Sequence, residues 1–168
     1  RVWKPFDRKK VLAAIREARW EGRLETVRRR PLVLLDGAHN PEGAEALAAH
    51  LGEVVRRPVV LVLAAMKDKD LAAMTRALFP RAAAVVLTRV PYKRSASPEE
   101  LLAAAPPSFS GPIFLEPGTR RAVELALSLG ARTSATCPRT PRTPCPPMPV
   151  VIAGSLFLIG EVKRLRLF

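Results

Sequence analysis

Leu-Val-Leu-Leu-Asp-Gly-Ala-His-Asn-Pro, residues 32–41, is the stretch that decides the fold of this chain. Its first four residues form an apolar run typical of a buried strand, and the amphipathic stretch 42–51 that follows is typical of a helix. Gly37 tolerates the sharp turn between them. Asn40 is a good N-cap residue, and Pro41 suits the first helical position, which needs no amide donor. The stretch therefore predicts a strand, a turn and a helix, with polar side chains at the carboxyl end of the strand.

The same turn is a candidate ligand site. In α/β sheets, ligands bind at the carboxyl ends of strands, and a helix N-terminus offers free N–H groups to a phosphate or carboxylate. Asp36 can accept from ribose hydroxyls or hold a metal through water, and His39 can donate to a phosphate or carboxylate. Two interpretations stay open: a nucleotide or anion site, and a polar turn that only caps the helix.

Strands and helices alternate along the rest of the chain. The expected strands are a short one within 20–27, then 32–35, 59–63, 84–88, 113–115 and 149–152. The expected helices are 7–18, 41–51, one from residue 70 to about 80, 98–105, 119–129 closed by Gly130 as a C-cap, and one from Ser155. This order predicts an α/β fold: a three-layer α/β/α, Rossmann-like domain with a mostly parallel, mixed sheet of about six strands.

One segment, residues 132–147, does not fit this pattern. It reads RTSATCPRTPRTPCPP, with both cysteines, five prolines and no Asp, Glu, Leu, Val or Ile. Such a stretch cannot form a helix or bury a hydrophobic face. A disordered surface loop is one interpretation. An out-of-frame translation of GC-rich codons is the other, which we favour because the composition changes abruptly on both sides; resequencing the gene or measuring the intact mass decides between them.

Charge and composition argue against nucleic-acid-binding and membrane proteins. The net charge is +13, but the basic residues are scattered and the aromatic content is only 5% without interleaving, so nucleic-acid binding is not expected. A polyanionic small molecule is the favoured partner. No apolar run approaches the roughly 20 residues that span a bilayer, and no signal peptide opens the chain. The two cysteines show neither zinc-ligand spacing nor a disulfide framework, so we expect a cytoplasmic protein without a membrane partner.

A second motif, WEGRLE at residues 20–25, precedes the first apolar strand. Gly22 lets the backbone turn, and Arg23 can present its guanidinium fork to a phosphate. The alternative is an exposed loop around a buried Trp20, and these residues alone favour that alternative.

Two further motifs follow expected strands. KDKD at 67–70 is either a solvated helix start or part of a site rim, and GSLFL at 154–158 forms either an anion-binding turn with the Ser155 hydroxyl or a plain N-cap. The chain contains no G-x-x-x-x-G-K-[ST] loop, no G-x-S-x-G elbow and no H-E-x-x-H motif. It therefore carries parts of a site without its own triphosphate cradle.

Taken together, four motifs resemble the C-terminal domain of folylpolyglutamate synthase, which is bifunctional with dihydrofolate synthase in many bacteria and is a relative of the Mur ligases. They are WxGRLE at 20–25, LDGAHNP at 35–41, MKDKD at 66–70 and GSLFLIGE at 154–161, and both their order and their spacing agree. The resemblance covers nearly the whole chain except 132–147. It implies one domain of the Mur ligase C-terminal type over residues 1–168, and an N-terminal P-loop ATPase domain that this chain does not contain.

The resemblance also implies an activity and roles for residues. The full enzyme is an ATP-dependent, ADP-forming amide ligase that phosphorylates the terminal carboxylate of a folate or dihydropteroate and lets the amine of L-glutamate attack. Arg23 is then expected to contact the ATP phosphate, with Asp36 and Asn40 on the nucleotide side. His39 and Ser155 are expected to hold glutamate or assist at the reacting centre. The Mg²⁺ ligands belong to the ATPase domain, so no metal ligand is assigned here.

The expected partners are therefore the protein's own ATPase domain, ATP, a folate and L-glutamate, in a monomeric enzyme. Two other functions stay open. One is the equivalent domain of a Mur-type ligase that acts on a peptidoglycan precursor, and the other is a non-catalytic module that binds polyanions or nucleic acid.

Overall fold

A computed structural model of the protein describes residues 7–17, 20–131 and 147–168. The strands are β1 Glu25–Arg29, β2 Leu32–Asp36, β3 Val59–Leu63, β4 Ala82–Leu87, β5 Ile113–Leu115 and β6 Val150–Ala153. The helices are α1 Arg8–Glu17, α2 Pro41–His50, α3 Leu71–Leu78, α4 Pro98–Ala103, α5 Thr119–Ala131 and α6 Leu156–Arg164. The two interpretations of the proline-rich segment concern residues 132–147, of which 132–146 lie outside the described part.

The six strands form one sheet in the order β1-β2-β6-β3-β4-β5. β1 is antiparallel to β2, and every other neighbouring pair is parallel, so the predicted mixed, mostly parallel sheet is confirmed. β6 lies between β2 and β3, with Ala153 opposite both Asp36 and Leu63. The carboxyl ends of these three strands therefore meet at one edge of the sheet.

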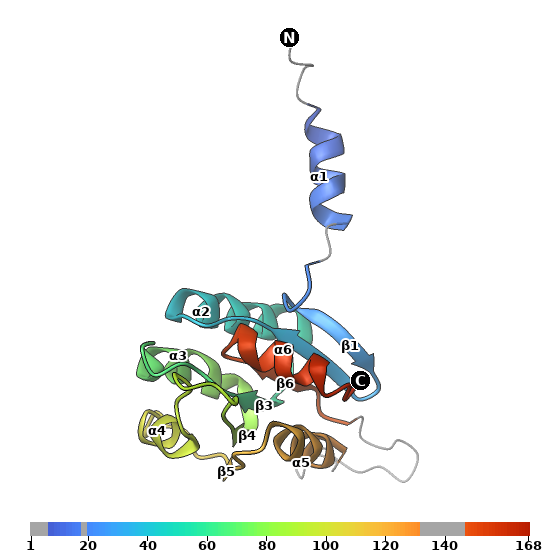
Figure 1. The fold of residues 1–168 in the computed structure, drawn as a ribbon. Coiled ribbons are helices and arrows are strands. Elements are labelled where there is room, and N and C mark those ends of the chain that lie inside the picture. The colour runs from blue at the N-terminus through green and yellow to red at the C-terminus, as the bar shows by residue number, and fades with distance from the viewer. Residues whose placement is uncertain (1–6, 18–19, 132–146) are drawn as a thin grey trace.

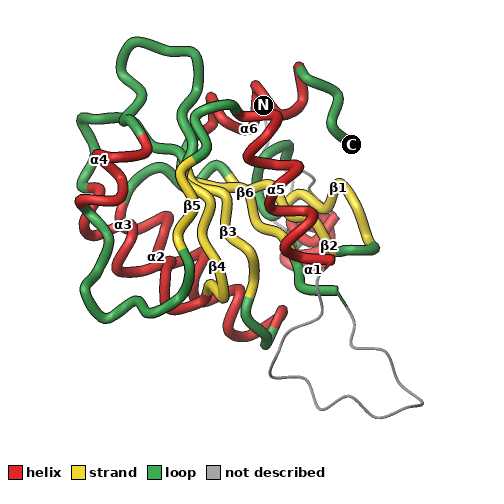
Figure 2. The backbone as a smooth tube through the Cα atoms, turned by 90° about the horizontal axis from the view of Figure 1, so that it is seen from below, coloured by secondary structure: helices red, strands yellow, loops and turns green. Residues whose placement is uncertain are grey.

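Helices cover both faces of the sheet, which confirms the three-layer α/β/α architecture. Helices α2, α3 and α4 lie on one side, and α5 and α6 lie on the other (Figure 1 and Figure 2). Strand β2 shows why: Leu34 packs with the α2–α4 face, whereas Val33 and Leu35 pack with the α5–α6 face. Side chains alternate across a strand, so an apolar run such as 32–35 supplies both cores at once.

One local expectation needs correction, and one helix lies apart from the sheet. Helix α5 runs through Gly130 to Ala131, so Gly130 is not the residue that closes the helix. A Cβ atom at Gly130 would lie 2.9 Å from the carbonyl oxygen of Met148, so glycine allows the chain before β6 to approach α5 closely. Helix α1 projects away from the sheet (Figure 1), and Leu12 on it is 45% exposed.

Candidate functional site

Asp36 ends β2 and holds two turns together. Its side chain is only 6% exposed. Oδ1 accepts the N–H of Ala38 at 2.8 Å, and Oδ2 accepts the N–H of Leu24 at 2.9 Å. The carboxylate therefore joins the turn after β2 to the turn that carries Arg23. Each oxygen keeps acceptor capacity, since a carboxylate offers about four lone-pair sites.

His39 and Asn40 follow in the same turn with distinct tasks. His39 Nδ1 lies 2.8 Å from the carbonyl oxygen of Gly37. A carbonyl can only accept, so Nδ1 carries the proton, and Nε2 of the neutral ring is the acceptor. Asn40 is the N-cap of α2, where its Oδ1 accepts the N–H of Gly43 at 2.9 Å. The predicted cap at Asn40 is confirmed, and its nucleotide role stays a prediction.

Ser155 begins α6 at the end of the neighbouring strand. It is 2% exposed, and its Oγ accepts the N–H of Phe157 at 3.1 Å. Gly154 before it has φ +103°, and a Cβ there would lie 2.6 Å from Leu63 Cδ1, so the turn from β6 into α6 requires glycine. No acceptor for the Ser155 hydroxyl proton occurs in the described part of the chain. The hydroxyl can therefore donate to a ligand.

His39 and Ser155 line one cavity, which we call the His39 cavity. Its volume is about 200 Å³. It is lined by His39, Met66, Lys69, Tyr92, Arg94, Ser155, Leu156 and Phe157. These residues come from the segments that follow β2, β3, β4 and β6, so the parallel strands deliver them to one edge. The structure thus brings together the two residues expected to hold the same substrate.

The lining of the His39 cavity is mostly apolar, and no carboxylate is among its residues. Two cations, Lys69 and Arg94, belong to this lining. Asp68 lies behind them, with Oδ2 2.7 Å from Arg94 Nη2 and 3.7 Å from Lys69 Nζ. Desolvation raises the pKa of Asp68, but hydrogen bonds from its backbone and Arg94, with the charges of Arg94 and Lys69, outweigh it and leave the pKa below its usual value. The ionised Asp68 orients both cations and leaves them donors to spare.

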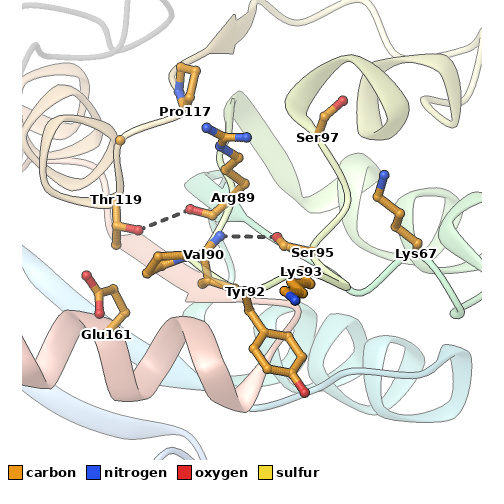
Figure 3. Close-up of a pocket in the computed structure, with 12 residues that line it drawn as sticks. Lys67, Arg89, Val90, Tyr92, Lys93, Ser95, Ser97, Pro117, Thr119 and Glu161 are labelled. Atoms are coloured by element: carbon orange, nitrogen blue, oxygen red, sulfur yellow. Dashed lines mark hydrogen bonds between the residues drawn. The ribbon is translucent and has the colours of Figure 1, made fainter.

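A second, larger cavity adjoins the first, and we call it the Lys93 cavity. It encloses about 550 Å³ near the carboxyl ends of β4 and β5 (Figure 3). Its cations are Lys67, Arg89 and Lys93, and Lys67 pairs with Glu100 at 3.1 Å. Tyr92 lines both cavities. Both interpretations of the KDKD motif therefore hold. Lys67 lines the Lys93 cavity and Lys69 lines the His39 cavity, while Asp70 is the N-cap of α3.

Arg23 lies in the exposed turn before β1. Its backbone N–H donates to the carbonyl of Trp20 at 3.1 Å. Its side chain forms no hydrogen bond or ion pair with any residue of the described ranges. Arg23 does not line the His39 cavity. Trp20 is 79% exposed, so the alternative of a loop built around a buried Trp20 is wrong.

Sequence reasoning missed the loop of residues 89–95, which supplies Tyr92 and Arg94 to the His39 cavity. The available signal was its position: like the two recognised turns, it directly follows an apolar strand of the parallel sheet. Within residues 7–17, 20–131 and 147–168, no three His, Cys, Asp or Glu side chains gather where they could hold a metal ion. The helices of that same part are all too short or too polar to cross a bilayer.

Comparisons with known proteins show which family this chain resembles in sequence and fold. Haloferax volcanii has a probable bifunctional folylpolyglutamate synthase/dihydropteroate synthase that is 31% identical over 158 residues, or 94% of this chain and 17% of the relative. The dihydrofolate synthase/folylpolyglutamate synthase of Mycobacterium tuberculosis is 36% identical over 147 residues, or 86% of this chain and 30% of the relative. The chain thus spans less than a third of either curated relative.

The solved structures give the same picture. Mycobacterium tuberculosis folylpolyglutamate synthase complexed with ADP superimposes with a TM-score of 0.82 at 32% identity, over 95% of this chain and 35% of that one. Residues 22–137 match the sequence profile of the family described as Mur ligase, glutamate ligase domain. This chain belongs to the Mur ligase glutamate ligase domain family.

Proposed function

We propose that this chain is the C-terminal, glutamate-binding domain of an ATP-dependent, ADP-forming ligase that adds L-glutamate to a folate. One observation carries the proposal: His39, Ser155, Lys69 and Arg94 converge on a cavity of about 200 Å³ without a lining carboxylate. Such a cavity suits a small dicarboxylate. The folylpolyglutamate synthases among the relatives favour a folate over a peptidoglycan precursor as the second substrate.

Each polar residue of the His39 cavity has its own role in binding glutamate. Lys69 and Arg94 attract its two carboxylates, and the free Ser155 hydroxyl proton donates to one of them. His39 Nε2, the acceptor nitrogen of the ring, accepts a hydrogen bond from the amine and takes its proton as the amine becomes a nucleophile. Attack on an acyl phosphate needs positioning and charge stabilisation more than a protein nucleophile.

The nucleotide side of the site lies at the turn before β1. Arg23 has no partner among the described residues, so its guanidinium is free to bind an ATP phosphate from across a domain interface. Asp36 fixes that turn and presents its remaining lone pairs, and Asn40 presents its amide N–H₂. The related Mycobacterium tuberculosis folylpolyglutamate synthase was solved complexed with ADP, which supports a nucleotide-dependent reaction for the proposed full-length enzyme.

The Mg²⁺ ligands belong, in this proposal, to a separate N-terminal P-loop ATPase domain, which closes on this domain, excludes water and protects the acyl phosphate. Within the described residues, no three His, Cys, Asp or Glu side chains gather where they could hold a metal ion by themselves. We further propose a monomeric, cytoplasmic enzyme with residues 1–168 as its single glutamate ligase domain.

The test uses the full-length ligase that carries this domain, with ADP release measured in the presence of a folate, ATP and glutamate. His39→Ala is expected to raise the KM for glutamate or lower kcat at least about tenfold. His50→Ala is the matched control, because His50 lies in the last turn of α2 and lines neither cavity. Arg23→Ala and Asp36→Ala are expected to lose activity with ATP.

Near-normal rates in all three site variants would reject the site. Activity with a peptidoglycan precursor in place of the folate would assign the second substrate to the Mur-type class. Steeply salt-dependent, saturable binding of nucleic acid, with no ligase activity, would replace the proposal by a polyanion-binding module.

A further inference from the structure

We infer that Lys163 is a positioning residue that holds the Arg23 turn in place through Glu25 and Glu21. Lys163 lies in the last turn of α6, outside the four recognised motifs. The inference rests on the proposed function for one link only, the contact between Arg23 and an ATP phosphate. The link between Lys163 and the turn is independent of that function.

Lys163 Nζ bridges two carboxylates that are distant from it in the sequence. It lies 2.9 Å from Oε2 of Glu25 and 2.9 Å from Oε2 of Glu21. Glu25 is 26% exposed and Glu21 is 87% exposed, so Glu25 is the better-shielded partner. The same Oε2 atom of Glu25 also accepts the N–H of Gly22 at 2.7 Å. Lys163 therefore fixes a carboxylate that in turn fixes the backbone next to Arg23.

The backbone around Arg23 is unusual enough to need such support. Gly22 has φ +68° and Leu24 has φ +46°, so the residues on either side of Arg23 are both left-handed. A leucine in this region costs on the order of 1 kcal/mol. Two hydrogen bonds to the β2 end compensate: Gly37 N–H donates to the carbonyl of Gly22 at 2.6 Å, and Leu24 N–H donates to Asp36.

Helix α6 connects this turn to the His39 cavity. Leu156 in its first turn covers Gly37, and Ile159 one turn later covers Gly22, where an added Cβ would lie 3.2 Å from Ile159 Cγ2. Its N-cap Ser155 lines the cavity together with Leu156 and Phe157 of its first turn. Helix α6 thus lines the His39 cavity at its start and contacts the Arg23 turn at its end. Lys163 is the charged contact at that end.

The charge of Lys163 is secure at neutral pH. Hydrogen bonds to Glu25 and then Glu21 raise the pKa of the lysine above its usual value; desolvation opposes them, and the negative charges of the two carboxylates add to the rise. A lysine that only balanced surface charge would not need a partially buried partner. The partner of Lys163 is the partially buried Glu25, which also accepts the N–H of Gly22 in the Arg23 turn.

The experiment compares Lys163→Met, Lys163→Arg and Arg164→Met in the full-length ligase. Arg164 is the matched control, because it makes an equally close ion pair on the same helix, 2.7 Å from Glu161, without touching the Arg23 turn. Lys163→Met is expected to raise the KM for ATP about tenfold, with the KM for glutamate changed less than about twofold. Lys163→Arg is expected to restore most of the loss, and Arg164→Met to leave both KM values unchanged.

A second measurement follows the turn itself, by hydrogen exchange of the Gly22 and Leu24 amides in the 168-residue chain. Faster exchange in Lys163→Met, but not in Arg164→Met, supports the positioning role. A merely structural lysine would lower the active fraction in Lys163→Met while the KM for ATP stayed the same, and this outcome overturns the inference. The two proposals can fail separately. An unchanged KM for ATP in Arg23→Ala would reject the nucleotide role of Arg23. Unaltered exchange of the Gly22 and Leu24 amides in Lys163→Met would show that Lys163 does not hold the turn.

Discussion

The rings of Tyr92 and Phe157 stack with their centroids 4.7 Å apart and their planes 15° from parallel. Tyr92 lines both cavities and Phe157 lines only the His39 cavity, so this pair forms the wall between the two. Removing the Tyr92 ring would open the amino-acid-sized cavity into one of about 550 Å³.

Tyr92→Ala is therefore expected to raise the KM for glutamate several-fold, while Tyr92→Phe keeps the stack and stays close to wild type. Stability should fall by only about 0.5–1 kcal/mol, because a stacked pair contributes this much and both rings are half-exposed. Steady-state kinetics and urea unfolding measure the two effects. An unchanged KM in Tyr92→Ala would show that the wall does not shape the glutamate site.

Gly154, in the turn between β6 and α6, and Gly160, within α6, should respond to alanine substitution in opposite directions. Gly154→Ala is expected to destabilise the fold by more than about 2 kcal/mol, because φ is +103° and the new Cβ meets Leu63 and the Ala64 backbone. Gly160→Ala, within α6, is expected to stabilise it by about 0.5–1 kcal/mol, since nothing lies within 4 Å of the added Cβ. Chemical denaturation of both variants checks the pair. Equal effects would contradict the geometry of the junction.

Thr88 is fully buried, and its Oγ1 has no hydrogen-bond partner in the described part of the chain. Thr88→Val is expected to stabilise the protein by about 1 kcal/mol, because it replaces an unpaired buried hydroxyl by a methyl group of similar shape. Thr75→Val is the contrasting variant. The Thr75 hydroxyl reaches the carbonyl of Ala104 at 2.5 Å, so its loss should cost about 1 kcal/mol. Destabilisation by Thr88→Val would indicate a partner for its hydroxyl.

Glu25 should make stability depend on acid pH. Desolvation raises its pKa, but hydrogen bonds from Lys163 and the Gly22 N–H, with the charge of Lys163, outweigh it, so the pKa lies below the usual 4.5. A carboxyl group with a lowered pKa stabilises the fold fully above 4.5 and loses that contribution as the pH falls through the folded-state value.

Glu25→Gln is therefore expected to lower the free energy of unfolding at neutral pH, and the gap from wild type should close in acid. Urea unfolding across this pH range measures it. A gap that stays constant from neutral pH to well below 4.5 would mean that the ionised carboxylate is not what stabilises the turn.

Local patterns predicted the elements well. The Asn40 cap formed as expected, and Ser97 and Glu100 form a capping box at the start of α4; both depend on side chains within one helical turn. The recognised motifs also placed His39 and Ser155 in one cavity, since the parallel strands before them end at the same edge. Their roles, with those of Arg23, Asp36 and Asn40, stay predictions.

Contacts between distant segments could not be predicted in the same way. Lys163 and Glu21 are 142 residues apart, and no periodicity in either segment marks them as partners. Trp20 is large and aromatic, which favours burial, yet the turn that orients Arg23 leaves it in solvent. The Tyr92 stack likewise depends on how two loops after different strands are placed.

The central position of β6 has a consequence for how the protein folds. Among the described strands, β1 pairs with β2, β2 also pairs with β6, and β6 alone connects these two strands to β3, β4 and β5. As the chain is synthesised, the two halves of the sheet cannot share a ladder until residues 150–153 have left the ribosome. Until then both inner edges are open to pairing with other chains. The His39 cavity therefore forms only after β6 has joined the sheet, since Ser155 follows that strand in the chain.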